Sequence, residues 1–168
     1  MKQKYHEIRF GSKATVNDHK FSMSVTNADF HIFPNWKKTP EQDACVIHLP
    51  SSVADAVAEN CDFACATRAC LPTAPAVPGE ACWAGGHGAT DYDDYDSTPV
   101  SMKSAGLNIF SEAYAKKKVK QTVLRDVDFK WMIIAGLPDR NNDGLADGGT
   151  DSCSGNSGSG LMCREGIM

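Results

Sequence analysis

The sequence predicts an all-β protein folded as an antiparallel barrel or sandwich, and two observations carry this prediction. First, short runs rich in β-formers, at residues 7–10, 21–25 and 44–47, alternate with polar turns such as residues 16–18. Second, the C-terminal part consists of short apolar runs separated by turns rich in glycine, proline and aspartate. With 168 residues and 42% hydrophobic composition the chain can bury one core, so we expect one domain over residues 1–168.

Local composition predicts what joins these strands. Residues 51–69 are rich in alanine, which predicts a short helix or a loop clipped by Cys61 and Cys65. Residues 71–79 form a proline-broken connector, which we expect at the surface, and residues 91–96 form an acidic loop.

Two segments in the C-terminal part have a distinct pattern. Residues 113–120 have helical composition, and the lysine run at residues 116–118 predicts a solvated helix face. Binding of phosphate or heparin by that run is the alternative. Residues 131–136, with the sequence WMIIAG, predict a buried strand, and a segment rich in glycine and aspartate follows at residues 138–160.

Charge and hydropathy argue against two classes of partner. The net charge of -4 and the pI near 5.7 provide no electrostatic attraction to nucleic acid or to an anionic membrane. No run approaches the roughly eighteen apolar residues of a membrane span, and residues 1–5 are not followed by the apolar stretch of a signal peptide. We therefore expect neither nucleic acid nor a membrane as partner.

Seven cysteines favour an oxidising compartment, because a cytosolic protein of this size usually carries fewer. The odd number leaves one without an intramolecular partner. Together with the missing signal peptide, this predicts a chain that is incomplete at its N-terminus. A zinc site is not expected, because no two cysteines form a CxxC pair and Cys61 and Cys65 have no second close pair to match them.

The sequence GGTDSCSGNSGSGLMC at residues 148–163 carries the chemistry. Glycines flank Ser157, so this serine can be held in a tight turn where the backbone amides before it and at it converge on one point. Converging donors are what an oxyanion hole requires. A Gly-Asn-Ser-Gly turn alone fits a flexible loop equally well, so the residues around it decide between the two interpretations.

Five motifs in the same order resemble those of the trypsin/chymotrypsin family of serine proteases. Residues 148–163 resemble the nucleophile motif GGxDSCxGDSGGPLxC. Further upstream, segments of this chain resemble the HPxY…NDIALLKL segment, the VCLP motif, the GxxC…GWG strand and the MICAG strand of the family, at residues 33–49, 69–72, 79–88 and 132–136 respectively. The resemblance identifies the chain as a partial and degenerate member of this family, the S1 peptidases.

The resemblance implies a fold and a division of the chain. The fold would be the trypsin-like double six-stranded antiparallel barrel, here incomplete at both ends. Residues 1–70 would supply the end of the first barrel and the connector, and residues 71–168 most of the second barrel.

The resemblance also implies roles for individual residues. Ser157 matches the nucleophile, Asp43 the triad aspartate, and the amides of Gly155 and Ser157 the oxyanion hole. Asp151 matches the floor of the primary specificity pocket, where a buried carboxylate at the end of a narrow slot selects an Arg or Lys side chain. A solvated loop carboxylate is the alternative for Asp151.

The triad histidine of the family has no match in this chain. In the family it precedes the aspartate by about forty-five residues, and that count from Asp43 passes Met1. Residues 8–11 resemble the VRLG strand that follows the family's histidine by about a dozen residues, and this second count agrees. We expect each histidine present to be structural or exposed: His6, His19, His31, His48 and His87.

The nucleophile loop departs from the family at further positions. The family's aspartate before the nucleophile, which pairs with the new N-terminal ammonium after zymogen cleavage, is Asn156 here and cannot make that ion pair. Ser159 and Gly160 stand where the family has Gly-Pro. Because the sequence ends at Met168, we also expect the specificity pocket to be open on one side.

The resemblance assigns one disulfide, between Cys82 and Cys163. The family partners of Cys70 and Cys153 would lie beyond the ends of the chain. Three cysteines have no family counterpart: Cys45, Cys61 and Cys65. A bridge among Cys61, Cys65 and Cys70 fits their spacing, but connectivity does not follow from sequence.

A second possible site lies at residues 139–147, which match the DxNxDG opening of a calcium loop. The candidate oxygen ligands are Asp139, Asn141, Asp143 and Asp147. Position twelve, where a bidentate glutamate is needed, is Thr150, so the oxygen shell is incomplete and we expect weak calcium affinity. A plain turn rich in Asx and glycine is the alternative, and no other cofactor is expected.

These observations lead to three hypotheses of function. The first is a serine endopeptidase domain with Arg/Lys preference in the intact family, extracellular, acting on proteins or peptides, and inactive in this chain because the histidine is missing. The second is a non-catalytic homologue that binds a protein partner, which Asn156 and Ser159 favour. A calcium-dependent structural protein is the third and weakest.

Overall fold

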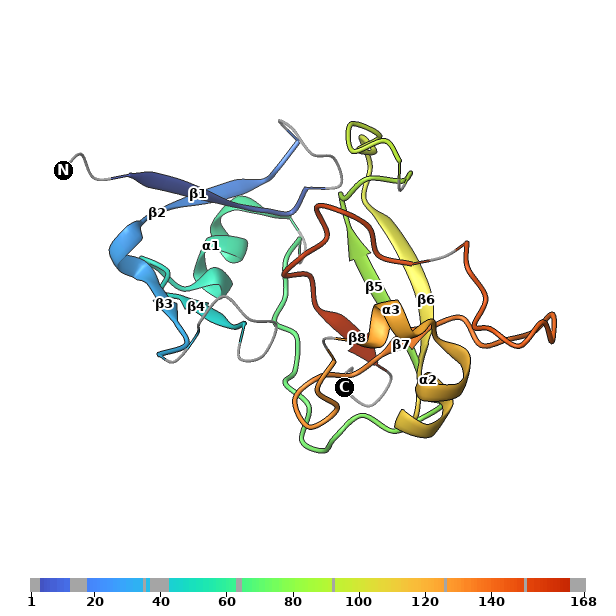
Figure 1. Cartoon of the computed structure of the whole chain (residues 1–168). Coiled ribbons are helices and arrows are strands. Elements are labelled where there is room, and N and C mark those ends of the chain that lie inside the picture. The colour runs from blue at the N-terminus through green and yellow to red at the C-terminus, as the bar shows by residue number, and fades with distance from the viewer. Residues whose placement is uncertain are drawn as a thin grey trace. The chain divides into compact units, whose positions relative to one another are not determined.

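The computed structural model describes residues 4–12, 18–34, 36, 43–62, 65–91, 93–125, 127–149 and 151–163. The turn expected at residues 16–18 therefore lies largely outside the described residues. The chain divides into two compact units, Met1–Arg68 and Ala69–Met168. Figure 1 labels the α-helices and the strands of both units.

The first unit contains a two-stranded antiparallel sheet of β1 (Tyr5–Phe10) and β2 (Phe21–Thr26). Strand β2 alternates in the way expected of a half-buried strand, because Phe21, Met23 and Val25 are buried while the serines between them are exposed. The rings of Phe10 and Phe21 stack across the strand pair with centroids 4.8 Å apart. These apolar side chains form the core of the unit.

The rest of the first unit consists of short elements. The 3-10 turn η1 (Asn27–Asp29) leads from β2 into β3 (Phe30–Ile32), which pairs antiparallel with β4 (Cys45–Ile47). Helix α1 (Val53–Asn60) begins at Ser52, whose hydroxyl accepts from the Asp55 amide, and a Cys61–Cys65 disulfide follows the helix. The Ala-rich segment therefore forms the expected helix, followed by one of the bridges left open by the sequence.

The second unit contains a four-stranded antiparallel sheet in the order β7-β6-β5-β8. Its strands are β5 (Ala81–Gly86), β6 (Lys103–Ile109), β7 (Ala135–Gly136) and β8 (Leu161–Cys163). Strand β6 buries Ala105, Leu107 and Ile109 on one face. Cys82 of β5 lies opposite Cys163 of β8, and the two form a disulfide with an S–S distance of 2.04 Å.

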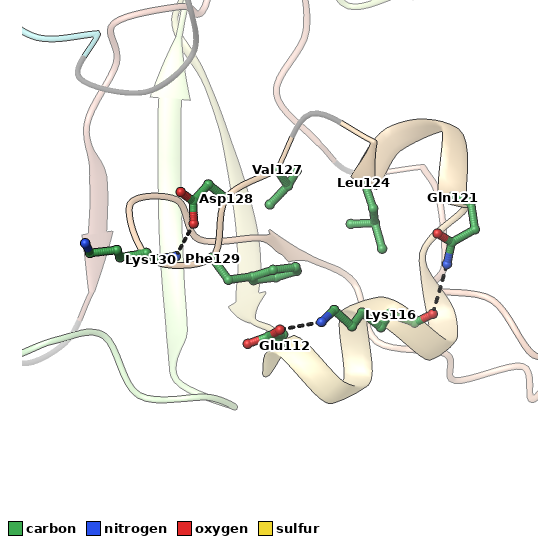
Figure 2. Close-up of a pocket in the computed structure, with 8 residues that line it drawn as sticks. All are labelled: Glu112, Lys116, Gln121, Leu124, Val127, Asp128, Phe129 and Lys130. Atoms are coloured by element: carbon green, nitrogen blue, oxygen red, sulfur yellow. Dashed lines mark hydrogen bonds and ion pairs between the residues drawn. The ribbon is translucent and has the colours of Figure 1, made fainter. Parts of the chain in front are cut away.

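Two short helices cover a second apolar cluster. Helix α2 (Glu112–Lys118) begins at Ser111, whose hydroxyl accepts from the Tyr114 amide, and α3 (Gln121–Leu124) follows it. Phe110, Ala115 and Leu124 are buried between these elements and residues 127–129. Figure 2 shows a surface pocket of about 660 Å³ beside this cluster, where the Glu112–Lys116 ion pair lies across from Leu124 and Phe129.

The buried strand expected at residues 131–136 is wrong for its first part. Only Ala135–Gly136 pair with β6, whereas Trp131 is 59% exposed and Ile133 is 55% exposed. The carbonyl of Asp128 accepts from the amides of both Trp131 and Met132, so the chain turns there. Because this turn takes up the start of the segment, its apolar composition does not produce a longer strand.

The lysine run also differs from a fully solvated helix face. Lys116 forms an ion pair with Glu112, and Lys118 is partly buried against Asp139.

The antiparallel pairing of every described sheet agrees with the predicted all-β class, while the two six-stranded barrels stay an expectation. No helix in the described ranges has the length and apolar composition needed to cross a membrane.

Candidate active site

Ser157 lies exposed at the start of the second of two consecutive tight turns. The Asn156 amide donates to the Cys153 carbonyl at 3.0 Å, and the Ser159 amide donates to the Asn156 carbonyl at 3.0 Å. Each turn has a glycine with positive φ at its third position, Gly155 at 93° and Gly158 at 88°. Residues with a Cβ rarely adopt this conformation, which explains why glycines flank the serine.

The nucleophile turn, residues 153–159, is fastened to the chain just after β5. The Gly88 amide donates to the Asn156 side-chain oxygen at 2.8 Å, and the Ala89 amide donates to the Ser154 carbonyl at 2.8 Å. Gly88 and Ala89 are buried, so these donors would be costly to leave unpaired.

The amides expected to form the oxyanion hole are open in this arrangement. Neither the Gly155 amide nor the Ser157 amide has a hydrogen-bond acceptor among the residues that the structure describes. Both residues are exposed, so water or a ligand oxygen has access to their N–H groups. The oxyanion-hole role of these two amides stays a prediction.

Asp151 and Asn156 line a groove of about 780 Å³ in the second unit. Its apolar wall comes from β5 and β6, with Ala84, Ala105 and Leu107. Asp151 is exposed, and its carboxylate accepts from the following Ser152 amide at 2.7 Å. The specificity role of Asp151 stays a prediction, in which a cationic side chain lying in the groove would reach this carboxylate.

Asp43 is an exposed residue of the first unit, two positions before β4. The next residue, Ala44, is fixed in place because its carbonyl accepts from the Phe33 amide at 2.9 Å. The carboxylate of Asp43 thus stands at the entry to the β3–β4 pair. Its match to the triad aspartate stays a prediction.

The histidines differ in their surroundings. His6 bonds to the Asn27 side chain at 2.8 Å and packs edge-on against Phe30. His87 follows Gly86, the last residue of β5, and precedes Gly88. The Nδ1 atoms of His87 and His19 are buried without a partner among the described residues. His31 and His48 are exposed.

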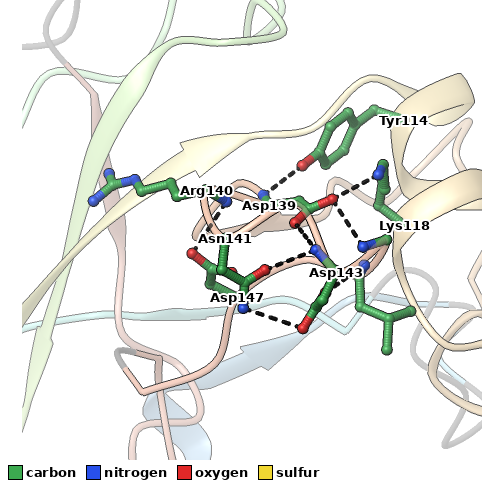
Figure 3. A network of polar contacts seen from close by, with 9 residues as sticks. Tyr114, Lys118, Asp139, Arg140, Asn141, Asp143 and Asp147 are labelled. Carbon is green, nitrogen blue, oxygen red and sulfur yellow. Dashed lines mark hydrogen bonds and ion pairs between the residues drawn. The ribbon is translucent and has the colours of Figure 1, made fainter.

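The candidate calcium loop already contains a cation from the protein. The ammonium of Lys118 lies 2.6 Å from an Asp139 carboxylate oxygen, and the Asp139 side chain is only 4% exposed (Figure 3). The Asp139 amide donates to the Tyr114 hydroxyl, and the Ala146 amide donates to the Lys118 carbonyl. The loop is therefore fastened to α2 at both of its ends.

The other candidate calcium ligands make local bonds. Oxygens of Asn141 and Asp143 accept from nearby loop amides, and Asp147 accepts from the Arg140 amide while its other oxygen is buried without a partner in the described residues. Thr150, at position twelve, lies outside the described residues. Calcium binding stays a prediction.

The Lys118–Asp139 contact sets the titration of both groups. The hydrogen bond from Lys118 holds the pKa of the Asp139 carboxyl below its ordinary value, and loop amides add to this effect. In return, the bond to Asp139 raises the pKa of the Lys118 ammonium. Both shifts favour the ion pair at neutral pH.

The cysteines offer no metal site in the described part of the chain. Among the described residues, the one cluster of three potential metal ligands is Glu80, Cys82 and Cys163. Its two cysteines are joined in a disulfide. Cys45 is exposed and Cys153 is partly buried, with its sulfur 3.8 Å from the Asp91 carbonyl.

Sequence reasoning missed the contribution of Gly88 and Ala89 to the site. It identified Gly88 only as the end of a strand motif and did not single out Ala89, whereas the amides of both residues bond to the nucleophile turn. The Gly88–Asn156 bond joins residues 68 positions apart, and no local sequence pattern predicts such a contact.

Comparison with solved structures finds a similar fold. The solved structure of neuropsin, a serine protease expressed in the limbic system of mouse brain, matches with a TM-score of 0.69 and 17% identity. The match covers 94% of this chain and 62% of the neuropsin chain, so this chain spans less than two thirds of that relative. At such identity the likeness shows the fold, that of a serine protease of this type.

The sequence profile of the trypsin family matches residues 2–168. This chain therefore belongs to the trypsin family. No match was found among curated proteins.

Proposed function

We propose that this chain carries the nucleophile of a serine endopeptidase domain of the trypsin type. The observation that carries the proposal is the nucleophile turn, where Ser157 is exposed beside two amides that have no acceptor in the described residues. The substrates would be proteins or peptides. The two disulfides suit an extracellular setting, where such bonds persist.

In the complete reaction the serine oxygen attacks the substrate carbonyl while a histidine accepts its proton. The Gly155 and Ser157 amides would stabilise the negative charge that develops on the carbonyl oxygen, and Asp43 would orient the histidine. Asp151, exposed on the groove wall, would favour a substrate with Arg or Lys before the cleaved bond. The histidine would then give the serine proton to the leaving amine as the peptide bond breaks, which leaves an acyl-enzyme on Ser157 that water hydrolyses.

A polypeptide of these residues alone would be inactive. None of its five histidines stands in the family's histidine motif, so Ser157 has no matching general base. Loss of the base leaves only the oxyanion hole and binding, with activity more than about a thousandfold below that of an intact triad.

The test is labelling of the purified chain with a fluorophosphonate probe, with intact mass as the readout and Ser157→Ala as the control. We expect no labelling above the control. Rapid stoichiometric labelling of the unmodified chain, lost in Ser157→Ala, would show a working base and overturn the inactive assignment.

A non-catalytic, protein-binding homologue is the second candidate. It is favoured by Asn156 and Ser159, which replace residues of the family's nucleophile loop. In this case the groove beside Asp151 would bind a protein segment without cleaving it. An Arg-containing peptide that binds equally well to the unmodified chain and to Ser157→Ala, and is recovered intact, would support this candidate.

A further inference from the structure

We propose that Asn156 is the positioning residue of the nucleophile turn and that it acts as a neutral amide seated between two glycines. The inference rests on the proposed function, because it concerns how Ser157 is held. It assigns to Asn156 a role that needs no ion pair, since both partners of the contact are uncharged.

Three groups of Asn156 form hydrogen bonds, two within the turn and one to the chain just after β5. Its backbone amide closes the first tight turn on Cys153, and its carbonyl closes the second on Ser159. Its side-chain oxygen accepts from the Gly88 amide at 2.8 Å. The residue immediately before the nucleophile is thus the point where both turns and the end of β5 meet.

The shape of the surroundings fits this amide closely. A Cβ placed on Gly86 would overlap the Asn156 side-chain oxygen, and one on Gly88 would lie 2.6 Å from the Asn156 Cγ. Neither glycine has positive φ, so backbone conformation does not require them. The space that they leave open is the space that the Asn156 side chain fills.

The burial of both partners makes loss of this hydrogen bond costly. Gly88 is buried and Asn156 is partly buried, so loss of the acceptor would leave the Gly88 amide away from water without a partner. The Ala89–Ser154 bond alone would then hold this side of the turn. We expect the turn to open more often in that case.

Amide hydrogen exchange followed by NMR tests the proposal on the full chain. In Asn156→Ala the Gly88 amide should exchange about tenfold faster, because a bond of this type contributes that order of protection. Asn156→Asp, which keeps an acceptor oxygen, should restore most of the protection. Asn141→Ala is the matched control, because it removes an asparagine from another loop of the same unit and should leave Gly88 unchanged.

The amides of the β5–β6 pair report whether the unit stays folded. Asn156→Ser, whose side chain is too short to reach Gly88, provides a milder second variant in case Asn156→Ala unfolds the unit. Unchanged Gly88 exchange in a folded Asn156→Ala or Asn156→Ser variant would overturn the proposal.

A double-mutant cycle tests the steric part. Gly86→Ala should destabilise the chain because its methyl group meets the Asn156 amide, with the Ser159 hydroxyl 3.3 Å away. In the Asn156→Ala background the cost should fall by at least half, since the main obstacle is gone. Strictly additive effects would contradict the seating of Asn156 against Gly86.

Neither measurement uses the reactivity of Ser157. The Gly88 amide exchange and the Gly86–Asn156 coupling can follow the expectation while Ser157 reacts with no fluorophosphonate under any condition. That result would support the contact of Asn156 with the two glycines and would overturn the protease assignment. The reverse pattern would retain the assignment and overturn this inference.

Discussion

The contacts of two side chains, Asn156 and Asp139, decide how the second unit holds its loops. Asn156 fixes the nucleophile turn through an uncharged hydrogen bond, whereas Asp139 fixes the loop at residues 137–147 through an ion pair with Lys118. The first contact does not titrate near neutral pH, while the second does so in acid.

The Lys118–Asp139 pair predicts a pH dependence. The pKa of Asp139 is lowered in the folded chain, so the pair stabilises the fold above the ordinary aspartate pKa, and this stabilisation is lost as pH falls through the lowered value. Asp139→Asn should reduce the melting temperature at pH 7, and this reduction should shrink as the pH falls below the ordinary aspartate pKa and through the lowered one. Thermal melts of both proteins across this range provide the measurement.

Glu112→Gln is a suitable control for this prediction, because it removes the exposed Lys116 ion pair on the same helix. It should change the melting temperature little at any pH, since exposed pairs contribute little to stability. If the melting temperatures of Asp139→Asn and the unmodified chain differ by the same amount at every pH, the Lys118–Asp139 ion pair does not cause the pH dependence.

These residue-level contacts were beyond the reach of sequence reasoning. The nucleophile motif and the resemblance identified Ser157 and the departure at Asn156, but neither predicts what the Asn156 side chain touches. Lys118 and Asp139, 21 positions apart, were assigned separately to a solvated helix face and to a calcium loop. Their pairing depends on how α2 and the loop pack.

At the scale of elements, alternation of side chains predicted some strands well. The pattern in β2 puts every second side chain in the core, so period and structure agree. The segment WMIIAG misled because apolar composition reports burial tendency and not whether a neighbouring strand is available. There the turn that begins at Asp128 takes up Trp131 and Met132, so that pairing with β6 is limited to Ala135–Gly136.

The disulfide between β5 and β8 should be the main covalent support of the four-stranded sheet. It links positions 81 residues apart, so removing it frees a long loop in the unfolded chain. The double variant Cys82→Ala, Cys163→Ala should lose about 2–5 kcal/mol of unfolding free energy. Urea denaturation measures this loss, monitored by tryptophan fluorescence in a Trp36→Phe, Trp131→Phe background so that Trp83 of β5 is the reporter.

The matched control removes the short bridge instead, as Cys61→Ala, Cys65→Ala. This bridge spans only 4 positions, so its removal should cost clearly less. Equal losses in the two double variants would contradict the role given to the Cys82–Cys163 bond.

At the scale of the whole molecule, the two units differ in how their sheets are supported. The described strands of Met1–Arg68 form two separate two-stranded sheets. Those of Ala69–Met168 form one four-stranded sheet, in which a disulfide joins the neighbouring strands β5 and β8. Isolated two-stranded sheets are marginal in water. We therefore expect the second unit to be the more stable one.

Hydrogen-exchange mass spectrometry tests this difference directly. Peptides from β5 and β6 should remain protected longer than peptides from β1 and β2, because opening of the second sheet is coupled to more strand pairs. Protection that is equal in the two units, or longer in β1–β2, would mean that the units unfold together or in the opposite order.

We propose that the turn around Ser157 is the nucleophile site of a trypsin-type protease domain, and that the histidines of this chain do not supply its general base. Fluorophosphonate labelling in the presence of added imidazole tests it most directly, because imidazole can accept the serine proton in place of the histidine. The account predicts imidazole-dependent labelling of one serine, abolished by Ser157→Ala. No labelling at any imidazole concentration, or labelling that persists in Ser157→Ala, would contradict it.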